Sequence, residues 1–209
     1  MCFDFNPIDT HKFVVGTEEG KIHLCSKTYA GQYLTTYTGH FLAVYAVKWN
    51  KYHPRVFLSC SADWTIKMWD CDLERPVIAF DLQCAVGDIE WAPYSSTVFA
   101  AVNSSGNLYI YDLNEDKHQH LCEHPALKKA KALHVSFNPE DPIILIGDEK
   151  GGVSLFKLSA ALSEGPMKPV IEKSKGDDEE KDKPKVPPKT SLELEREKLD
   201  AFLSTRDKV

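Results

Sequence analysis

An apolar run that ends on a large aromatic residue occurs four times in the 209-residue chain. The four aromatic residues are Phe5, Trp49, Trp91 and Phe137. The steps between them are 44, 42 and 46 residues, and a small or polar residue follows each one. Self-similarity at a period of about 20–50 residues is typical of propellers and solenoids, in which each unit buries its apolar surface against the next. The sequence therefore predicts a fold of stacked, similar units.

Each repeat has the same order of predicted strands after its aromatic anchor. A polar loop leads to an apolar strand, and these strands begin at Phe13, Phe57, Phe99 and Ile144. Because they are continuously apolar, we expect both of their faces to be buried. A tight turn and a strand of alternating polarity follow, at residues 21–25, 65–69, 107–111 and 153–156. A more polar fourth strand is expected in the first three repeats, near residues 32–37, 77–81 and 118–122.

The composition changes after the fourth repeat. The repeats occupy residues 1–160, whereas residues 161–189 are rich in proline and in mixed charges. Few apolar side chains there could offset the entropy of ordering, so we predict a disordered, charged linker. Residues 190–206 are predicted to form a short amphipathic C-terminal helix, whose apolar side consists of Leu192, Leu199, Phe202 and Leu203. This helix either remains solvated or docks on a partner or on the repeats.

Charge and hydropathy argue against two classes of partner. The formal net charge is -6, and binding to nucleic acid phosphates requires a basic face. No apolar run approaches the ~20 residues that span a bilayer, so we expect no membrane contact.

The six cysteines include no C-x-x-C pair, which favours reduced thiols in a cytoplasmic compartment.

The second repeat contains a distinctive set of polar residues. It opens on a Gly-His pair that includes His40 and ends on a Trp-Asp pair that includes Trp69, with Ser59 and Asp63 between them. In these residues the chain resembles the WD-repeat family. The resemblance implies an all-β fold of WD-repeat β-propeller blades, about four of them and thus a partial propeller. It also implies that His40, Ser59, Asp63 and Trp69 form a hydrogen-bonded chain that ties one blade together. Their donors and acceptors suit this, because Trp donates, Asp accepts and neutral His does both.

The other three repeats lack this set of polar residues. In place of Trp69 they have Cys25, Tyr111 and Phe156, and in place of Asp63 they have Glu19, Ser105 and Lys150. We therefore expect the other blades to depend on apolar packing.

Two groups of residues have the composition of a chemical site. His40, Ser59 and Asp63 have the residue types of a hydrolase triad, but a nucleophile must be exposed beside its base, and Ser59 falls in a buried strand. We therefore predict no catalytic residue.

A second cluster alternates along the chain as His118, His120, Cys122 and His124. On a strand these side chains would share one face and could bind zinc. Alternate residues of a strand lie roughly 6–7 Å apart, however, so we expect a solvated outer strand and no metal.

Longer stretches of the chain carry a more specific resemblance. They are residues 15–22, 57–70, 85–102 and 142–151. They resemble the C-terminal half of axonemal dynein intermediate chains, of the outer-arm type, and the resemblance covers residues 3–158. It implies a non-catalytic scaffold that attaches dynein heavy chains for microtubule-based ciliary motility, without a cofactor. The implied partners are a heavy chain, a second intermediate chain and light chains. The implied location is the cytoplasm, in the cytoskeleton of the ciliary axoneme.

The sequence is compatible with more than one number of blades and more than one function. The family fold has seven blades, so we expect the four repeats to be part of a longer propeller. The alternatives are closure of four blades and completion by another chain, since an open propeller exposes two blade edges. The alternative function is a generic WD-repeat adaptor, for example a substrate receptor of a ubiquitin ligase. Trp64, in the tight turn of the second repeat, is a candidate partner surface unless it is buried against the neighbouring blade.

Overall fold

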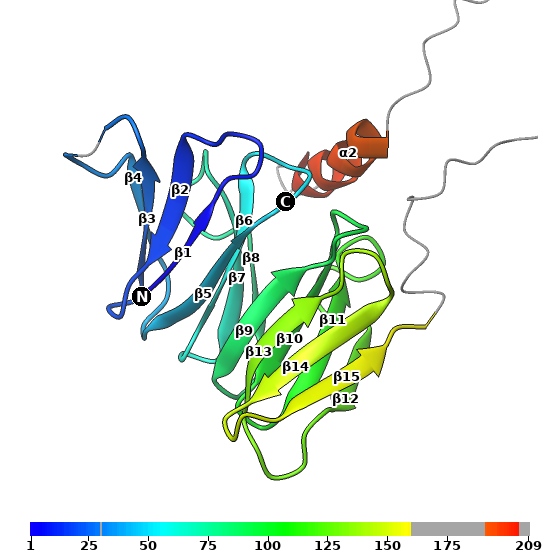
Figure 1. Ribbon diagram of the computed structural model, residues 1–209. Coiled ribbons are helices and arrows are strands. Elements are labelled where there is room, and N and C mark those ends of the chain that lie inside the picture. The colour runs from blue at the N-terminus through cyan, green and yellow to red at the C-terminus, as the bar shows by residue number, and fades with distance from the viewer. Residues whose placement is uncertain (30, 160–190, 205–209) are drawn as a thin grey trace, which may run out of the picture.

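The computed structural model describes residues 1–29, 31–159 and 191–204. In this part of the chain four antiparallel sheets follow one another along an arc, and one helix lies across one end of them (Figure 1). Within each sheet, strands that are consecutive in the chain pair with each other. This arrangement confirms the predicted all-β fold of propeller blades, and we call the sheets blades one to four.

The strands have the following bounds. Blade one contains β1 (Cys2–Phe5), β2 (Lys12–Gly16), β3 (Lys21–Ser26) and β4 (Thr35–Thr38). Blade two contains β5 (Val44–Trp49), β6 (Val56–Ser61), β7 (Thr65–Asp70) and β8 (Ile78–Asp81). Blade three contains β9 (Val86–Trp91), β10 (Val98–Asn103), β11 (Asn107–Asp112) and β12 (Cys122–Pro125). Blade four contains β13 (Ala132–Phe137), β14 (Ile143–Asp148) and β15 (Val153–Lys157).

The four blades share one strand register. In each blade the second strand pairs with the third so that equivalent residues face each other: Phe13 and Cys25, Phe57 and Trp69, Phe99 and Tyr111, Ile144 and Phe156. The residues that stand in place of Trp69 in the other repeats therefore occupy its position in space. The period read from the sequence is a structural repeat.

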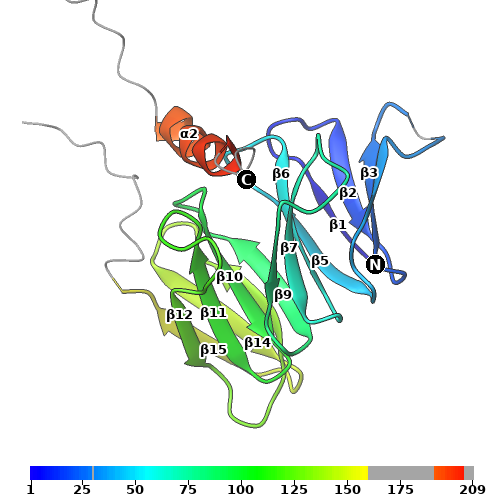
Figure 2. The same ribbon diagram turned by 180° about the vertical axis from the view of Figure 1, so that it is seen from behind.

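The hydrophobic core consists of three clusters, one between each pair of neighbouring blades. Trp49 lies between blades one and two, Trp91 between blades two and three, and Phe137 between blades three and four. The first strands of the four blades contact one another in turn, β1 with β5, β5 with β9 and β9 with β13, so they lie side by side from blade one to blade four (Figures 1 and 2). Phe5, the anchor of the first repeat, is 47% exposed because blade one has a neighbouring blade on only one of its two sides.

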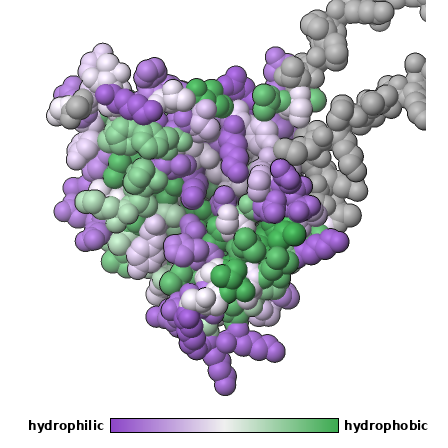
Figure 3. All heavy atoms as spheres, in the orientation of Figure 1, coloured by the Kyte–Doolittle hydropathy of each residue, from purple (hydrophilic) through white to green (hydrophobic). Residues whose placement is uncertain are grey.

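The expectation that all second strands are buried on both faces is wrong for the two outer blades. Every residue of β6 and β10 is buried, whereas β2 and β14 are only partly buried. The reason is that blades two and three have a neighbour on each side and blades one and four have one. On the open face of blade four, Val153 and Leu155 are 72% and 62% exposed, and an apolar area covers this part of the molecule (Figure 3).

The predicted C-terminal helix is present as α2 (Ser191–Ser204), and it docks on the blades. The predicted linker, residues 161–189, lies outside the described residues. Among the residues that the structure describes, no helix has the length and apolar character needed to cross a membrane.

Candidate functional site

Blade two holds a chain of four hydrogen-bonded side chains. The indole N–H of Trp69, on β7, donates to Ser59 Oγ on β6 at 2.8 Å. Ser59 Oγ lies 2.7 Å from Nε2 of His40, and His40 Nδ1 lies 2.9 Å from Asp63 Oδ2. One arrangement of protons satisfies every contact: Ser59 donates to Nε2, and Nδ1–H donates to the Asp63 carboxylate. The structure thus brings together the four residues that the sequence singled out.

The electrostatics of this chain favour a neutral imidazole beside a carboxylate. Burial lowers the pKa of His40 despite the opposing effect of Asp63. Burial also opposes the ionisation of Asp63, but hydrogen bonds from Thr65, His40 and the backbone N–H of Phe41 outweigh it and lower the pKa of Asp63 to about 2. The carboxylate is therefore charged at neutral pH and anchors one end of the chain.

This grouping has no access to a substrate. Ser59 is fully buried, and the side chains of His40 and Asp63 are 0% and 7% exposed. The Ser59 hydroxyl is already occupied by His40 and Trp69. A nucleophile must reach the atom that it attacks, so the three residues can stabilise the blade but cannot act as a hydrolase triad here.

Trp64 directly follows Asp63 in the turn between β6 and β7, and its backbone is unusual. Its φ is 72°, a left-handed conformation that bulky residues rarely adopt. The other three blades have Gly20, Gly106 and Gly151 at this place, with φ of 83°, 83° and 81°. The Trp64 residue is 54% exposed. Full burial against the neighbouring blade, the alternative considered from the sequence, is therefore wrong.

Two exposed apolar residues in the loop before β5 were not predicted from the sequence. Phe41 and Leu42 lie in the loop between β4 and β5 and are 86% and 53% exposed. The Phe41 backbone N–H donates to Asp63 Oδ2 at 3.1 Å, which ties this loop to the turn that contains Trp64. The available signal was a pair of large apolar residues in a loop, where turn formers such as Gly, Asn and Ser dominate.

The cluster of histidines and a cysteine does not assemble on one strand. β12 begins at Cys122, because the Asp116 carboxylate accepts the backbone N–H groups of His118 and Gln119 and turns the chain before it. His120 packs edge-on against Tyr109 and Tyr111, whereas His124 packs against Phe156. Among the described residues, no group of three His, Cys, Asp or Glu side chains could hold a metal ion.

Helix α2 lies against the loops that join the first and second strands of blades two and three. The fully buried carboxylate of Glu195 accepts the Ser96 backbone N–H at 2.7 Å. The backbone carbonyl of Glu195 accepts the Ser96 hydroxyl at 2.8 Å. Leu199 is fully buried in the cluster that contains Trp91. Asp200 Oδ1 lies 3.0 Å from Nε2 of His53. The helix therefore docks on the blades, which was one of the alternatives left open by the sequence.

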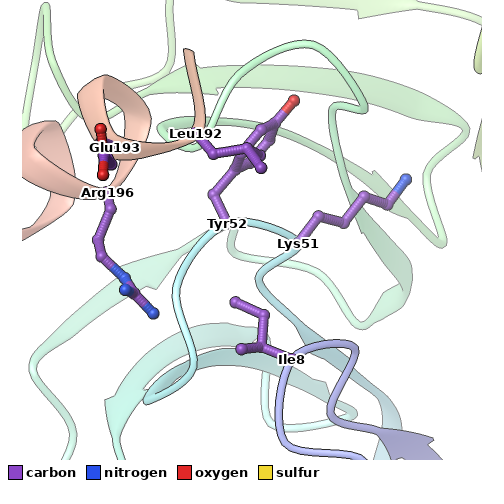
Figure 4. A pocket seen from close by; sticks show the side chains of 6 residues that line it. All are labelled: Ile8, Lys51, Tyr52, Leu192, Glu193 and Arg196. Atoms are coloured by element: carbon purple, nitrogen blue, oxygen red, sulfur yellow. The ribbon is translucent and has the colours of Figure 1, made fainter. Parts of the chain in front are cut away.

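An open pocket of about 240 Å³ lies beside the first turn of α2. Its lining consists of Ile8, Lys51, Tyr52, Leu192, Glu193 and Arg196 (Figure 4). Leu192 lies on the predicted apolar side of the helix but is 63% exposed at this pocket. The charged ends of Lys51 and Arg196 point away from each other (Figure 4). The pocket therefore does not direct its two cations toward one ligand.

A comparison with protein families agrees with the architecture of blade two. The model of the WD domain, G-beta repeat, matches residues 31–70, a segment that includes the whole hydrogen-bonded chain. Together with the four-stranded sheets and their shared register, the match defines the class: WD-repeat β-propeller blades.

Curated relatives narrow this class. Dynein intermediate chain 2, ciliary, of Heliocidaris crassispina is 52% identical over 168 residues, which are 79% of this chain and 24% of the relative. The 78 kDa intermediate chain of the flagellar outer arm dynein of Chlamydomonas reinhardtii is 47% identical over 165 residues, or 77% and 24%. Dynein axonemal intermediate chain 1 of Bos taurus is 49% identical over 167 residues, or 79% and 24%. The chain is thus related to the axonemal dynein intermediate chains, as predicted, and it spans about a quarter of their length.

Proposed function

We propose that the chain acts as a non-catalytic scaffold in an axonemal dynein complex, where its blades attach heavy chains for ciliary motility. The observation that carries the proposal is the identity of 47% to 52% with intermediate chains named for cilia and for the flagellar outer arm. The packing supports it, because every pair of neighbouring blades is joined by a hydrophobic cluster and the grouping of His40, Ser59 and Asp63 is sealed inside blade two. Stacked repeats of this kind present extended binding surfaces.

The proposed partners are a dynein heavy chain, a second intermediate chain and light chains. The proposed location is the ciliary axoneme, as part of the cytoplasmic cytoskeleton. We also infer that His40, Ser59, Asp63 and Trp69 are a structural tetrad that holds the strands of blade two together. Its support is the unbroken hydrogen-bonded chain from β7 to the loop before β5.

Expression of the tagged chain in ciliated cells tests the functional proposal. Imaging is expected to place the tag along the axoneme, and precipitation from a salt extract of axonemes is expected to recover a dynein heavy chain. Tagged subunits of the axonemal dynein already present in the cells serve as the positive control. Recovery of ubiquitin-ligase subunits instead, with no axonemal signal, would favour the generic adaptor and contradict the proposal.

A further inference from the structure

Three exposed apolar residues lie on two loops of blade two that hydrogen bonds join to each other. Phe41, Leu42 and Trp64, which we call the blade-two patch, are 86%, 53% and 54% exposed. Blade two has a neighbour on both sides, so another blade of the arc would not cover them. The exposed apolar residues of blade four differ in this respect, since they lie on its open face.

The backbone at Trp64 indicates that the indole does not serve the turn. Three equivalent turns use glycine, which adopts a positive φ without steric cost. Trp64 adopts a φ of 72° and still leaves its side chain half exposed. Strain of this kind persists only where the surrounding structure holds it, and such residues cluster at binding sites.

The surrounding hydrogen bonds hold the patch rigid. The Asp63 carboxylate accepts the backbone N–H groups of Phe41 and Thr65, both at 3.1 Å. The Ser61 hydroxyl donates to the carbonyl of Leu42 at 3.0 Å. The tetrad therefore holds the two loops that carry the patch, and a preordered surface loses less entropy when it binds.

The patch lies at the end of the blade that α2 leaves open. Helix α2 contacts Ser96 and His53, which belong to the loops between first and second strands. Trp64 belongs to a turn between second and third strands. In an antiparallel sheet these two kinds of connection lie at opposite ends. Within the described residues, α2 thus covers one loop end of blades two and three and leaves the other end free.

The charges around the patch define the chemistry of its partner. Glu18 and Glu19 are exposed in the turn of blade one, whose Gly20 packs against the carbonyls of His40 and Leu42. On the other side, the exposed Asp81 is paired with Thr65. Lys21 forms an ion pair with Glu19 at 3.4 Å. The buried Lys67 donates to Thr65 Oγ1 at 3.0 Å. Because Lys21 offsets Glu19, Glu18 and Asp81 are the exposed carboxylates that remain at the rim of the patch.

We propose that the blade-two patch binds an amphipathic helix of a partner protein, with an apolar stripe on Phe41, Leu42 and Trp64 and with Lys or Arg residues beside Glu18 and Asp81. Apolar helix anchors spaced by three or four residues fit a compact apolar site, and opposite charges at the rim orient them. This inference rests on the proposed function, since it assigns that helix to the dynein heavy chain that the blades are proposed to attach.

The test compares three tagged versions of the chain in ciliated cells, each recovered from a salt extract of axonemes. They are the unchanged chain, the variant Phe41→Ala/Leu42→Ala/Trp64→Gly, and the control Leu73→Ala, which truncates an exposed leucine of blade two in the loop between β7 and β8. Glycine at position 64 reproduces the other blades, so the variant should keep its thermal melt. We expect the triple variant to recover at least about tenfold less dynein heavy chain than the control, because anchors of an interface carry most of its binding energy.

A photoreactive amino acid at position 64 identifies the occupant. The expected cross-linked peptide comes from a dynein heavy chain and has apolar residues at helical spacing between basic ones. A cross-link to a second copy of the chain, or equal recovery of heavy chain by the triple variant and the control, would overturn this inference while leaving the proposed function intact. Failure of the unchanged chain to recover any dynein subunit would instead overturn the proposed function, and with it this inference.

Discussion

At the scale of single residues, blade two combines a buried polar chain with an exposed aromatic patch. The tetrad satisfies each of its polar atoms inside the blade, and a network of this kind loses more than one interaction when a member is removed. Ser59 is the central member, because its hydroxyl serves both Trp69 and His40. The four residues were predicted from the resemblance of the second repeat to the WD-repeat family. Of the patch only Trp64 was predicted, because the exposure of Phe41 and Leu42 depends on how the loops fold.

Ser59→Ala tests the structural role of the tetrad. The substitution leaves the Trp69 indole N–H and His40 Nε2 buried without a partner, and each lost partner costs about 1–3 kcal/mol. We expect the free energy of unfolding to fall by about 2–4 kcal/mol, measured by urea denaturation. Ser104→Ala, in the turn between β10 and β11, is the matched control and should change it by less than about 0.5 kcal/mol. Equal effects of the two substitutions would show that the tetrad does not stabilise the blade.

Trp64→Gly tests whether the indole serves the fold. Glycine relieves the left-handed strain, which costs about 1–2 kcal/mol for a residue with a Cβ. It also makes the unfolded chain more flexible, which costs about 0.4–1 kcal/mol. We expect the free energy of unfolding in urea to stay within about 1 kcal/mol of the unchanged chain. A loss above ~2 kcal/mol would mean that the ring packs on the blade and stabilises it.

The tetrad also predicts a pH dependence. The pKa of His40 is lower in the folded chain than in the unfolded chain, so on acidification the unfolded chain takes up a proton first. The neutral His40 therefore stabilises the fold less and less as the pH falls below about 6.5. Asp63, with a pKa lowered to about 2, adds a second loss as the pH falls from about 4 toward 2. The groups that face His40 are Asp63, Lys67, Thr65 and Ser59.

Thermal melts between pH 7.5 and pH 5 measure the His40 contribution. His23 and His53 also have a lowered pKa, chiefly through burial, so three histidines contribute to the slope of the unchanged chain. His40→Gln removes one of them, and we expect its melting temperature to fall less steeply with acid than that of the unchanged chain. Parallel slopes would show that the protonation of His40 is not linked to folding.

At the scale of elements, the strands were largely predictable and their environments were not. Periods of two and the regular anchors located the second and third strands, because these patterns are local. The displacement of β12 depends on a turn made by Asp116, and the partial burial of β2 and β14 depends on which blades have neighbours. The docking of α2 depends on contacts between residues 99 and 147 positions apart, and no local pattern contains that information.

Leu199→Ala tests the docking of α2. Leu199 is fully buried, and truncation of a buried leucine costs about 2–5 kcal/mol. We expect faster hydrogen exchange throughout α2 and at the Ser96 amide, measured by mass spectrometry. Leu192→Ala, which changes a leucine of the same helix that is 63% exposed, is the control and should leave the exchange unchanged. The same exchange in both variants would mean that α2 is not held by the blades.

At the scale of the whole molecule, the arc of blades has two open faces. Phe3 on blade one and Val153 and Leu155 on blade four are 67%, 72% and 62% exposed. Large exposed apolar areas mark interaction sites or aggregation hazards, and blade four ends on β15 without an outer strand among the described residues. These faces would suit further blades or another chain. The number of blades in the complete assembly therefore bears directly on how the chain functions.

Sedimentation of an axonemal salt extract through a sucrose gradient tests the central claim most directly. We expect the chain to migrate with a dynein heavy chain, far below the position of free proteins of its size, because its blades belong to the motor complex. A chain that instead migrates alone as a stable monomer near 23.6 kDa, while the heavy chain sediments separately, would contradict both the scaffold function and the need to cover the open faces.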